Sequence, residues 1–274
     1  MADLAYGRHA VAEVPRRASR LAVPKPLLGW LLPALLALIW EAACRTGLVA
    51  PNLLPAPSAI FFTLSRLAAT GDLWLHLGAT IYRLGLGFAL GTLFGTLLGA
   101  LTGASVLARQ VLDPMIQGLR SVPSIAWVPL FILWLGIFES SKIVLIAVGV
   151  FFPVYLNLMI GIAQVDRKLV EVGRVHRLSR AALVWRILLP ASLPSYITGL
   201  RGGLGLGWMF VVAAELMAAS EGVGFLLIDG QQTGRPALVI GAILLFAMLG
   251  KTSDLLLARI GKSLLGWQDV VGEG

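Results

Sequence analysis

Long apolar runs are the feature of this chain that most restricts its fold. The hydrocarbon core of a bilayer is about 30 Å thick, so a helix that crosses it needs about 20 mainly apolar residues. Runs of this kind lie at residues 27–43, 78–104, 111–135, 141–163, 192–219 and 237–258. Within lipid the backbone must satisfy its own polar groups, which favours helices. The sequence therefore predicts an all-α integral membrane protein with six transmembrane helices.

The composition supports a membrane protein over a soluble one. Hydrophobic residues make up 58% of the chain, charged residues 13%, and the mean hydropathy is +0.86. A net charge of +8 could indicate a nucleic-acid partner. The basic residues, however, lie between the apolar runs and do not gather on one soluble domain. The expected surrounding is a lipid bilayer, and no nucleic acid is expected as a partner.

Lysine and arginine are unevenly distributed between the connecting segments, which predicts an orientation. If the amino terminus is cytoplasmic, 14 of the 22 basic residues lie in inside segments and four in outside segments. Cytoplasmic loops carry the excess of positive charge, so both termini are expected inside. The chain then divides into a basic cytoplasmic tail at 1–26, a transmembrane domain at 27–265 with a cytoplasmic loop at 164–190, and a cytoplasmic tail at 266–274. Residues 51–74, a proline-rich turn and an amphipathic helical stretch, are placed on the outer surface.

Motifs for catalysis, cofactors or metals are not found. The single Cys44 excludes an intrachain disulfide, and the histidines, His9, His76 and His176, lack the spacing of a metal site. Gly250-Lys251-Thr252 resembles the end of a phosphate-binding loop, but the glycine that should precede it is missing. We therefore expect no enzymatic activity, bound cofactor or metal in this chain.

The third apolar run combines prolines with polar residues. Pro114, Pro123 and Pro129 remove backbone donors and bend or break a helix. Irregular backbone at membrane depth is tolerated where it is buried or lines a water-filled cavity. Residues near this break are candidates for lining a solute pathway: Arg120, Ser121, Pro123 and Ser124. A simple proline kink is an equally good interpretation.

Charged residues inside the other runs have both functional and structural interpretations. Glu215, in the fifth run, could face a gate or a solute-delivering partner, and it is included among the pathway candidates; a hydrogen-bonding role inside the helix bundle explains it equally well. Lys251 and Asp254 are three residues apart on one helix, which predicts an ion pair between them.

Glycines recur every fourth residue in the second and fifth runs. The two ladders are Gly87, Gly91, Gly95, Gly99 and Gly103, and then Gly199, Gly203 and Gly207. A helix face without side chains lets another helix approach closely. Tight packing is the preferred interpretation, and a glycine-lined passage for solute is the alternative.

A charged segment, residues 166–190, interrupts the apolar runs and resembles a known loop. Glu171 is followed six residues later by Arg177, and nine further residues lead to Ile187-Leu188-Leu189-Pro190. This spacing resembles the E-A-A-x-x-x-G-x(9)-I-x-L-P loop of bacterial ABC importer permeases, which serve binding-protein-dependent transport. The resemblance runs from about residue 53 to residue 267. Strings such as Gly222-Val223-Gly224-Phe225 are most similar to the subgroup that imports aliphatic sulfonates, with taurine and nitrate permeases close by.

The resemblance implies a fold, a location and partners. It implies the type I ABC importer permease fold in the bacterial inner membrane, with two copies forming the pathway for a small organic anion. It also implies a pair of ATPase subunits that carry ATP and Mg, and a periplasmic solute-binding protein. The loop at 164–190 would dock on the ATPase through residues at the family's motif positions: Glu171, Gly173, Arg177, Leu178, Ile187, Leu189 and Pro190.

Two positions depart from the family's loop. Val172 replaces a small alanine, and Arg177 replaces the glycine of the turn between the two loop helices. A non-glycine residue in left-handed geometry costs about 1–2 kcal/mol. The turn is therefore expected to differ, or Arg177 to gain a compensating contact.

Other transport functions stay open at the level of the sequence. A self-contained secondary transporter would need ion-coupling residues in the middle of the membrane, and the intramembrane charges come close to this without being central. Nitrate, taurine or another small solute could replace the sulfonate. Pairing with a related permease instead of a second copy is also compatible with the sequence.

Overall fold

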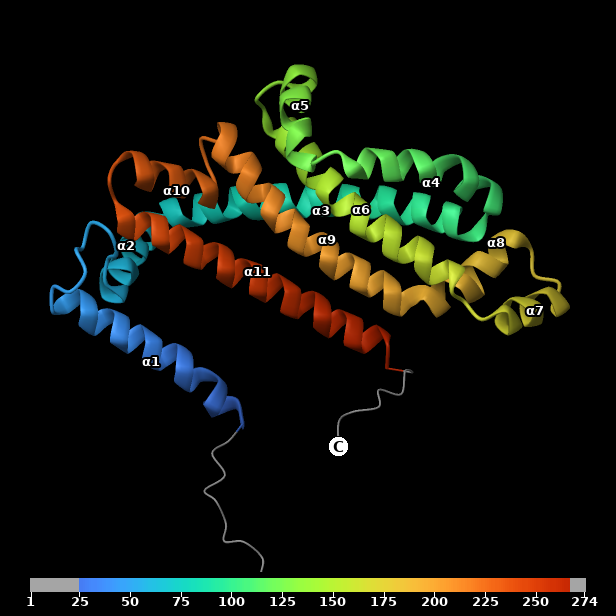
Figure 1. Cartoon of the computed structure of the whole chain (residues 1–274), viewed down its shortest axis with the longest axis horizontal. Helices are drawn as coiled ribbons and strands as arrows, with labels where there is room; N and C mark the ends of the chain where they lie inside the picture. Colours follow the sequence, from blue (N-terminus) through green and yellow to red (C-terminus); the bar gives the residue numbers. More distant parts are fainter. Residues whose placement is uncertain (1–24, 267–274) are drawn as a thin grey trace, which may run out of the picture.

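The computed structural model describes residues 25–266, and the secondary structure of this part of the chain is entirely helical, with turns and irregular segments between the helices (Figure 1). The predicted tail at 266–274 lies almost wholly outside the described residues, as does nearly all of the tail at 1–26. The helices are α1 (Lys25–Arg45), α2 (Pro57–Thr70), α3 (Asp72–Ala104), α4 (Val106–Ser121), α5 (Val128–Leu135), α6 (Glu139–Ala163), α7 (Arg167–Val175), α8 (Arg180–Leu183), α9 (Leu189–Ala218), α10 (Val223–Gln232) and α11 (Pro236–Leu264). A 3-10 turn precedes α5, and a π-helical segment joins α8 to α9.

Four helical segments in the described part are long and apolar enough to cross a membrane: α3, α6, α11 and the segment Ala181–Met217, which includes all of α9 but its last residue. The third predicted span, 111–135, is not one straight helix. It consists of α4 and a short helical segment ending at Leu135, bent by 86° between them, and counting this pair as one span gives five. The bend follows from Pro123, which cannot donate a backbone hydrogen bond. The first predicted run lies in α1.

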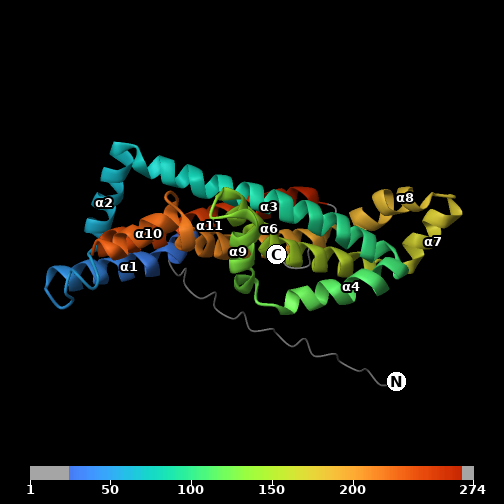
Figure 2. The same cartoon turned by 90° about the horizontal axis from the view of Figure 1, so that it is seen from above.

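The centre of the bundle is formed by α3, α6 and α9, which lie side by side (Figures 1 and 2). The glycine ladders explain this contact. A Cβ atom on Gly91 would lie 2.5 Å from the carbonyl oxygen of Ala147, and one on Gly199 would lie 3.0 Å from that of Pro153. Side chains at these positions would force α6 away from both neighbours. The packing interpretation of the ladders is confirmed.

One end of the bundle carries α2 and α10, and the opposite end carries α7 and α8 (Figure 2). The predicted helical stretch within 51–74 is present as α2, which ends at Gly71 in left-handed geometry (φ 90°). Glu41 joins α1 to α2, because its carboxylate accepts hydrogen bonds from the Ser58 backbone N (3.0 Å) and Oγ (2.8 Å). In Figure 1 the start of α1 and the end of α11 both point toward the half of the molecule that carries α7 and α8.

Candidate functional site

The loop at 164–190 forms a helical hairpin with defined helix ends. Asp166 caps α7 by accepting a hydrogen bond from the backbone N of Lys168 at 2.9 Å. At the other end Arg177 has a φ of 51°, in the left-handed region, and no other non-glycine residue of the described chain has a positive φ. The backbone N of Leu178 donates to the oxygen of Gly173 at 3.1 Å, and that of Arg177 to the oxygen of Arg174 at 2.8 Å. These two bonds define a Schellman motif, so Arg177 adopts the turn geometry that glycine provides in the family.

Gly173 lets the two halves of the hairpin touch. It is buried, and a Cβ atom there would lie 2.5 Å from Cδ1 of Leu183 and 2.6 Å from Cδ1 of Ile187. Leu178 and Ile187 are half-buried on the same side. Three of the predicted loop residues, Gly173, Leu178 and Ile187, therefore hold the hairpin together.

The outer face of the hairpin is exposed and mixed in character. Glu171 is exposed on α7 and makes no ion pair within the described part of the chain. Large apolar side chains accompany it: Leu169, Val172, Val175 and Trp185. Val175 and Trp185 are 80% and 73% exposed. An exposed surface of apolar and charged side chains, at the tip of a rigid hairpin, is suited to docking on a protein partner.

The hairpin continues into α9 without an interruption of helical structure. Leu189 is half-buried and Pro190 exposed at the start of α9. The backbone N of Leu189 bonds to the oxygen of Val184, five residues earlier, which completes the π-helical segment. A displacement of the hairpin would therefore pass directly into α9 and the centre of the bundle.

The geometry at Arg177 gives a prediction with a matched control. Arg177→Gly removes the left-handed penalty of about 1–2 kcal/mol, offset in part by the greater freedom of glycine when unfolded. We expect a net gain of up to about 1 kcal/mol. Arg174→Gly, in the last turn of the same helix, should instead cost about 1 kcal/mol. Thermal unfolding of the two purified variants checks the opposite signs; a lower melting temperature for Arg177→Gly would contradict the left-handed assignment.

An ion cluster whose members Arg83, Lys142 and Glu215 are buried lies toward the opposite end of the bundle. Arg83 of α3 is 3% exposed, and its guanidinium contacts Glu215 Oε1 of α9 at 2.8 Å. The same group contacts Glu139 at the start of α6 at 2.5 Å, and Lys142 contacts Glu139 at 2.8 Å. Two acidic and two basic residues thus neutralise one another between three helices. Pairing of this kind is what a buried charge requires.

The ion cluster also holds the loop that precedes α10. Glu215 Oε2 accepts a hydrogen bond from the backbone N of Gly224 at 2.8 Å, and Arg83 donates to the backbone oxygen of Glu221 at 2.6 Å. Thr80 donates to Glu215 and accepts from the backbone N of Val223, both at 2.8 Å. Of the two interpretations of Glu215, the structure favours the hydrogen-bonding role, because its contacts lie within the bundle and it is 1% exposed.

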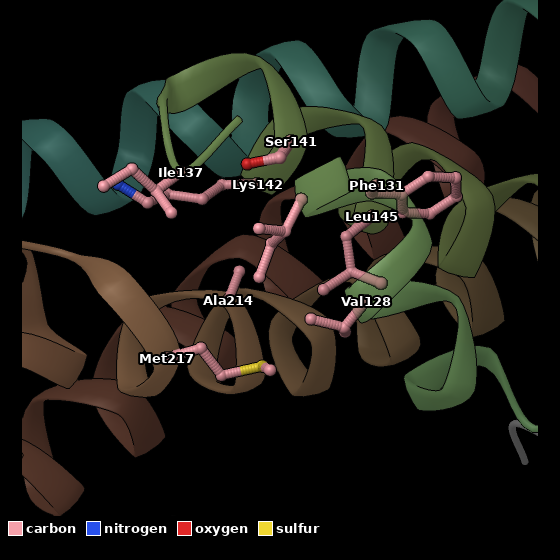
Figure 3. Close-up of a pocket in the computed structure, with 9 residues that line it drawn as sticks. Val128, Phe131, Ile137, Ser141, Lys142, Leu145, Ala214 and Met217 are labelled. Atoms are coloured by element: carbon pink, nitrogen blue, oxygen red, sulfur yellow. The ribbon is translucent and has the colours of Figure 1, made fainter. Parts of the chain in front are cut away.

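A small cavity lies beside the ion cluster (Figure 3). Its walls include Lys142, Ala214 and Met217, together with apolar residues of α5 such as Val128. Its volume is about 20 Å³, which is room for about one water molecule. This cavity is too small for an organic solute.

The remaining predicted pathway residues lie at the break after α4. Arg120 is exposed and donates to Oε1 of Gln117 at 3.3 Å, and Ser121 donates to the oxygen of Gly118 at 2.7 Å. Pro123 lines an open hollow shared with α9. The backbone of Ser124 begins the 3-10 turn, but its side chain lies outside the described part. Since the contacts of Glu215 lie with α3 and α10, the structure does not bring Glu215 together with these residues.

Asp254 has a different partner from the one predicted. Its carboxylate accepts hydrogen bonds from both Nε (2.8 Å) and Nη2 (3.0 Å) of Arg201 on α9. In the described part of the chain the predicted ion pair between Lys251 and Asp254 is not formed, and Asp254 instead makes this two-point contact between α9 and α11. Arg201 is closer to the ideal partner because its planar guanidinium matches a carboxylate at two points. Within the described residues no group of three or more metal-binding side chains occurs.

The sequence could have suggested part of the ion cluster. Arg83 and Glu215 are opposite charges in two apolar runs, which is a signal for pairing. Glu139 was missed as a participant because it stands just before the fourth predicted run. His76, whose Nδ1 accepts from the backbone N of Gly222 at 3.1 Å, was likewise missed.

Helices of this length and composition, with a helical hairpin at one end, are those of a multi-pass membrane protein. Residues 91–265 match the family described as binding-protein-dependent transport system inner membrane component, and the chain belongs to this family. It is an inner-membrane protein and a subunit of an ABC importer. Family membership thus separates it from self-contained secondary transporters.

Several curated proteins are similar over most of the chain. The aliphatic sulfonates transport permease protein SsuC of Bacillus subtilis is 41% identical, over 88% of this chain and 87% of its own length. The taurine transport system permease protein TauC of Escherichia coli is 34% identical, over 87% of this chain and 88% of its own. Among solved structures, the inward-facing MetNI methionine ABC transporter matches with a TM-score of 0.61 at 18% identity, covering 72% of this chain and 95% of that one. This last match shows that the fold is shared with a type I importer permease.

Proposed function

We propose that this permease subunit imports a small organic anion, with an aliphatic sulfonate as the solute. The observation that carries the proposal is the identity of 41% to the permeases named for aliphatic sulfonates, in both Bacillus subtilis and Escherichia coli. The taurine permease, whose named substrate also carries a sulfonate group, is less similar, at 34%. The relatives named for nitrate import are 31–32% identical and cover 68–70% of this chain.

Coupling to a separate ATPase is assigned to the hairpin at 164–190. Glu171, exposed on α7, contacts the ATPase. Four residues keep the hairpin rigid: Gly173, Arg177, Leu178 and Ile187. Leu189 and Pro190 connect the hairpin to α9. The exposed apolar residues beside Glu171 support this assignment, since such a surface is costly in water unless it is covered. ATP and Mg bind on the partner, and this chain contributes no cofactor site.

The orientation and assembly are part of the proposal. Six spans, with the first in α1 and the third formed by α4 and α5, place both termini and the hairpin in the cytoplasm. The direction of α1 and α11 in Figure 1 and the excess of basic residues in the inside segments support this. A second copy of the chain completes the pathway, and a periplasmic binding protein delivers solute at the end that carries α2 and α10. The tail at 1–26 is basic and cytoplasmic, as is the short tail at 266–274.

Reconstitution tests the proposal. Liposomes containing the permease, its ATPase and an internal supply of ATP should take up ethanesulfonate when the loaded binding protein is added outside. Uptake should stop when the ATPase is omitted or when ATP is replaced by a non-hydrolysable analogue. Uptake driven by an ion gradient in the absence of the ATPase would overturn the coupling assignment, and ATP-dependent uptake of nitrate but of no sulfonate would overturn the substrate.

A further inference from the structure

Arg120 forms no ion pair within the described part of the chain, and the carboxylate of Asp113 is connected to it only through Gln117. Arg83 and Arg201 form ion pairs with carboxylates. Arg120 is exposed, and its guanidinium contacts only the neutral amide of Gln117 within the described residues. An unpaired charge at membrane depth is costly, and such residues face a water-filled cavity or a solute pathway.

The packing of α4 places Arg120 near the middle of the bundle. Ile116, one turn earlier on α4, packs against Tyr155 and Met159, in a cluster that also includes Phe151. Phe151 stands at the centre of α6, which spans Glu139–Ala163. A step of four residues along a helix is about 6 Å, so Arg120 lies far from both ends of α6. Interfacial solvation therefore does not explain its charge.

A chain of hydrogen bonds orients the Arg120 side chain. Tyr155 donates to Oδ1 of Asp113 at 2.9 Å, and Gln117 donates to the same oxygen at 3.4 Å. Gln117 then accepts from Arg120 through its amide oxygen. A guanidinium has five N–H donors, so this single contact leaves most of them available. Tyr155 of α6 thus orients the guanidinium of Arg120 through Asp113 and Gln117, and the remaining donors of the guanidinium can bind an anion.

An apolar hollow opens at the break three residues after Arg120. Its volume is about 360 Å³, within the range of about 300–1,000 Å³ that is usual for small-molecule sites. Its walls are Pro123 and Ile125 on one side and Leu206, Met209, Phe210 and Ala213 of α9 on the other. The bend of 86° after α4 leaves part of this α9 face uncovered, with Met209 56% exposed.

We infer that Arg120 and this hollow form a transmembrane subsite for an amphipathic organic anion. The guanidinium binds the anionic oxygens, which suit its planar array of donors, and the hollow binds the aliphatic chain. The inference rests on the proposed function and deepens it, because it makes the permease itself a selector of solute. Each methylene that enters the hollow favours binding by about fourfold. Glu215 takes no part in this subsite.

The test uses the complete transporter of permease, ATPase and binding protein in liposomes, with uptake of ethanesulfonate, butanesulfonate and hexanesulfonate measured in parallel. Arg120→Gln should lower the uptake of all three by about tenfold or more, since the charge-assisted bonds are lost. Arg120→Lys should retain a larger share of the wild-type uptake than Arg120→Gln, because lysine keeps the positive charge. Arg66→Gln, at an exposed arginine of α2, is the matched control and should transport normally.

A second variant separates the subsite from a general loss of structure. Ala213→Leu narrows the hollow and should lower the ratio of hexanesulfonate to ethanesulfonate uptake several-fold, a change that misfolding does not produce. An unchanged ratio, or normal transport by Arg120→Gln, would overturn the inference while the proposed function stands. Failure of the wild-type transporter to import any sulfonate would overturn both. ATP hydrolysis stimulated by the loaded binding protein, recorded in every sample, shows whether the complex is assembled.

Discussion

Replacing Glu215 with alanine is expected to lower the melting temperature of the purified permease by on the order of 10 °C. The substitution leaves the guanidinium of Arg83 without one of its buried partners, and breaking a buried pair in this way costs about 3–5 kcal/mol. For a chain of this size each kcal/mol corresponds to about 2–4 °C. The carboxylate also accepts from Thr80 and from the backbone of Gly224. The loop before α10 should therefore loosen, which amide hydrogen exchange at residues 219–224 would detect.

Two further variants make this expectation specific. Glu215→Gln keeps an acceptor for Thr80 and Gly224, so its loss of stability should be smaller than that of Glu215→Ala. Glu221→Ala changes an exposed neighbouring carboxylate whose backbone, and not its side chain, contacts Arg83; it should stay within about 0.5 kcal/mol of the wild type. Equal melting temperatures for Glu215→Ala and the wild type would show that the ion cluster does not hold the loop that precedes α10.

Reversing the charge at Glu171 is expected to reduce ATP-driven uptake by about tenfold or more while the membrane domain stays folded. Glu171 is exposed and makes no ion pair within the described chain, so the fold does not depend on it. At an interface, by contrast, placing a like charge against the partner's group costs several kcal/mol. Glu171→Arg should therefore lose the ATPase during co-purification, with the melting temperature of the permease alone unchanged.

Graded substitution distinguishes this effect from general damage. Glu171→Gln removes the charge without reversing it and should fall between the wild type and Glu171→Arg in both uptake and co-purification. Glu221→Arg, a charge reversal at the other end of the bundle, should still co-purify with the ATPase. Normal coupling in Glu171→Arg would remove Glu171 from the interface with the ATPase.

Much of the architecture could be predicted because the signals are local. The apolar runs predicted helices that the structure contains, and the proline-rich segment after residue 50 leads into α2 as expected. The turn at Arg177 was predicted to differ or to gain a compensating contact, whereas the structure keeps the left-handed geometry, with Arg177 at a φ of 51°. Side chains on the glycine ladders would collide with a neighbour, so close packing was predictable without knowing which helix the neighbour is.

Prediction was less successful where a result depends on how helices are rotated against each other. Glu215 could have faced a pathway or the bundle, and only the placement of α3 beside α9 turns its carboxylate toward Thr80 and Arg83. Asp254 was matched with Lys251 because the two share a helix. Across the gap between helices, Arg201 offers two parallel hydrogen bonds, which a neighbour on the same helix does not provide.

The sequence by itself determined that this chain is a helical membrane protein with a positively charged loop of the importer-permease type. Hydrophobic length, charge distribution and motif spacing are properties of consecutive residues, and they need no neighbour to be recognised. The tertiary structure decided which charges neutralise one another: Arg83 meets Glu139 and Glu215, which lie 56 and 132 positions further along the chain. It also left Arg120 without an ion pair in the described chain, three residues before the proline that lines an apolar hollow. These outcomes depend on the contact of three helices, because only packing removes water from some charges and leaves others free to bind a solute.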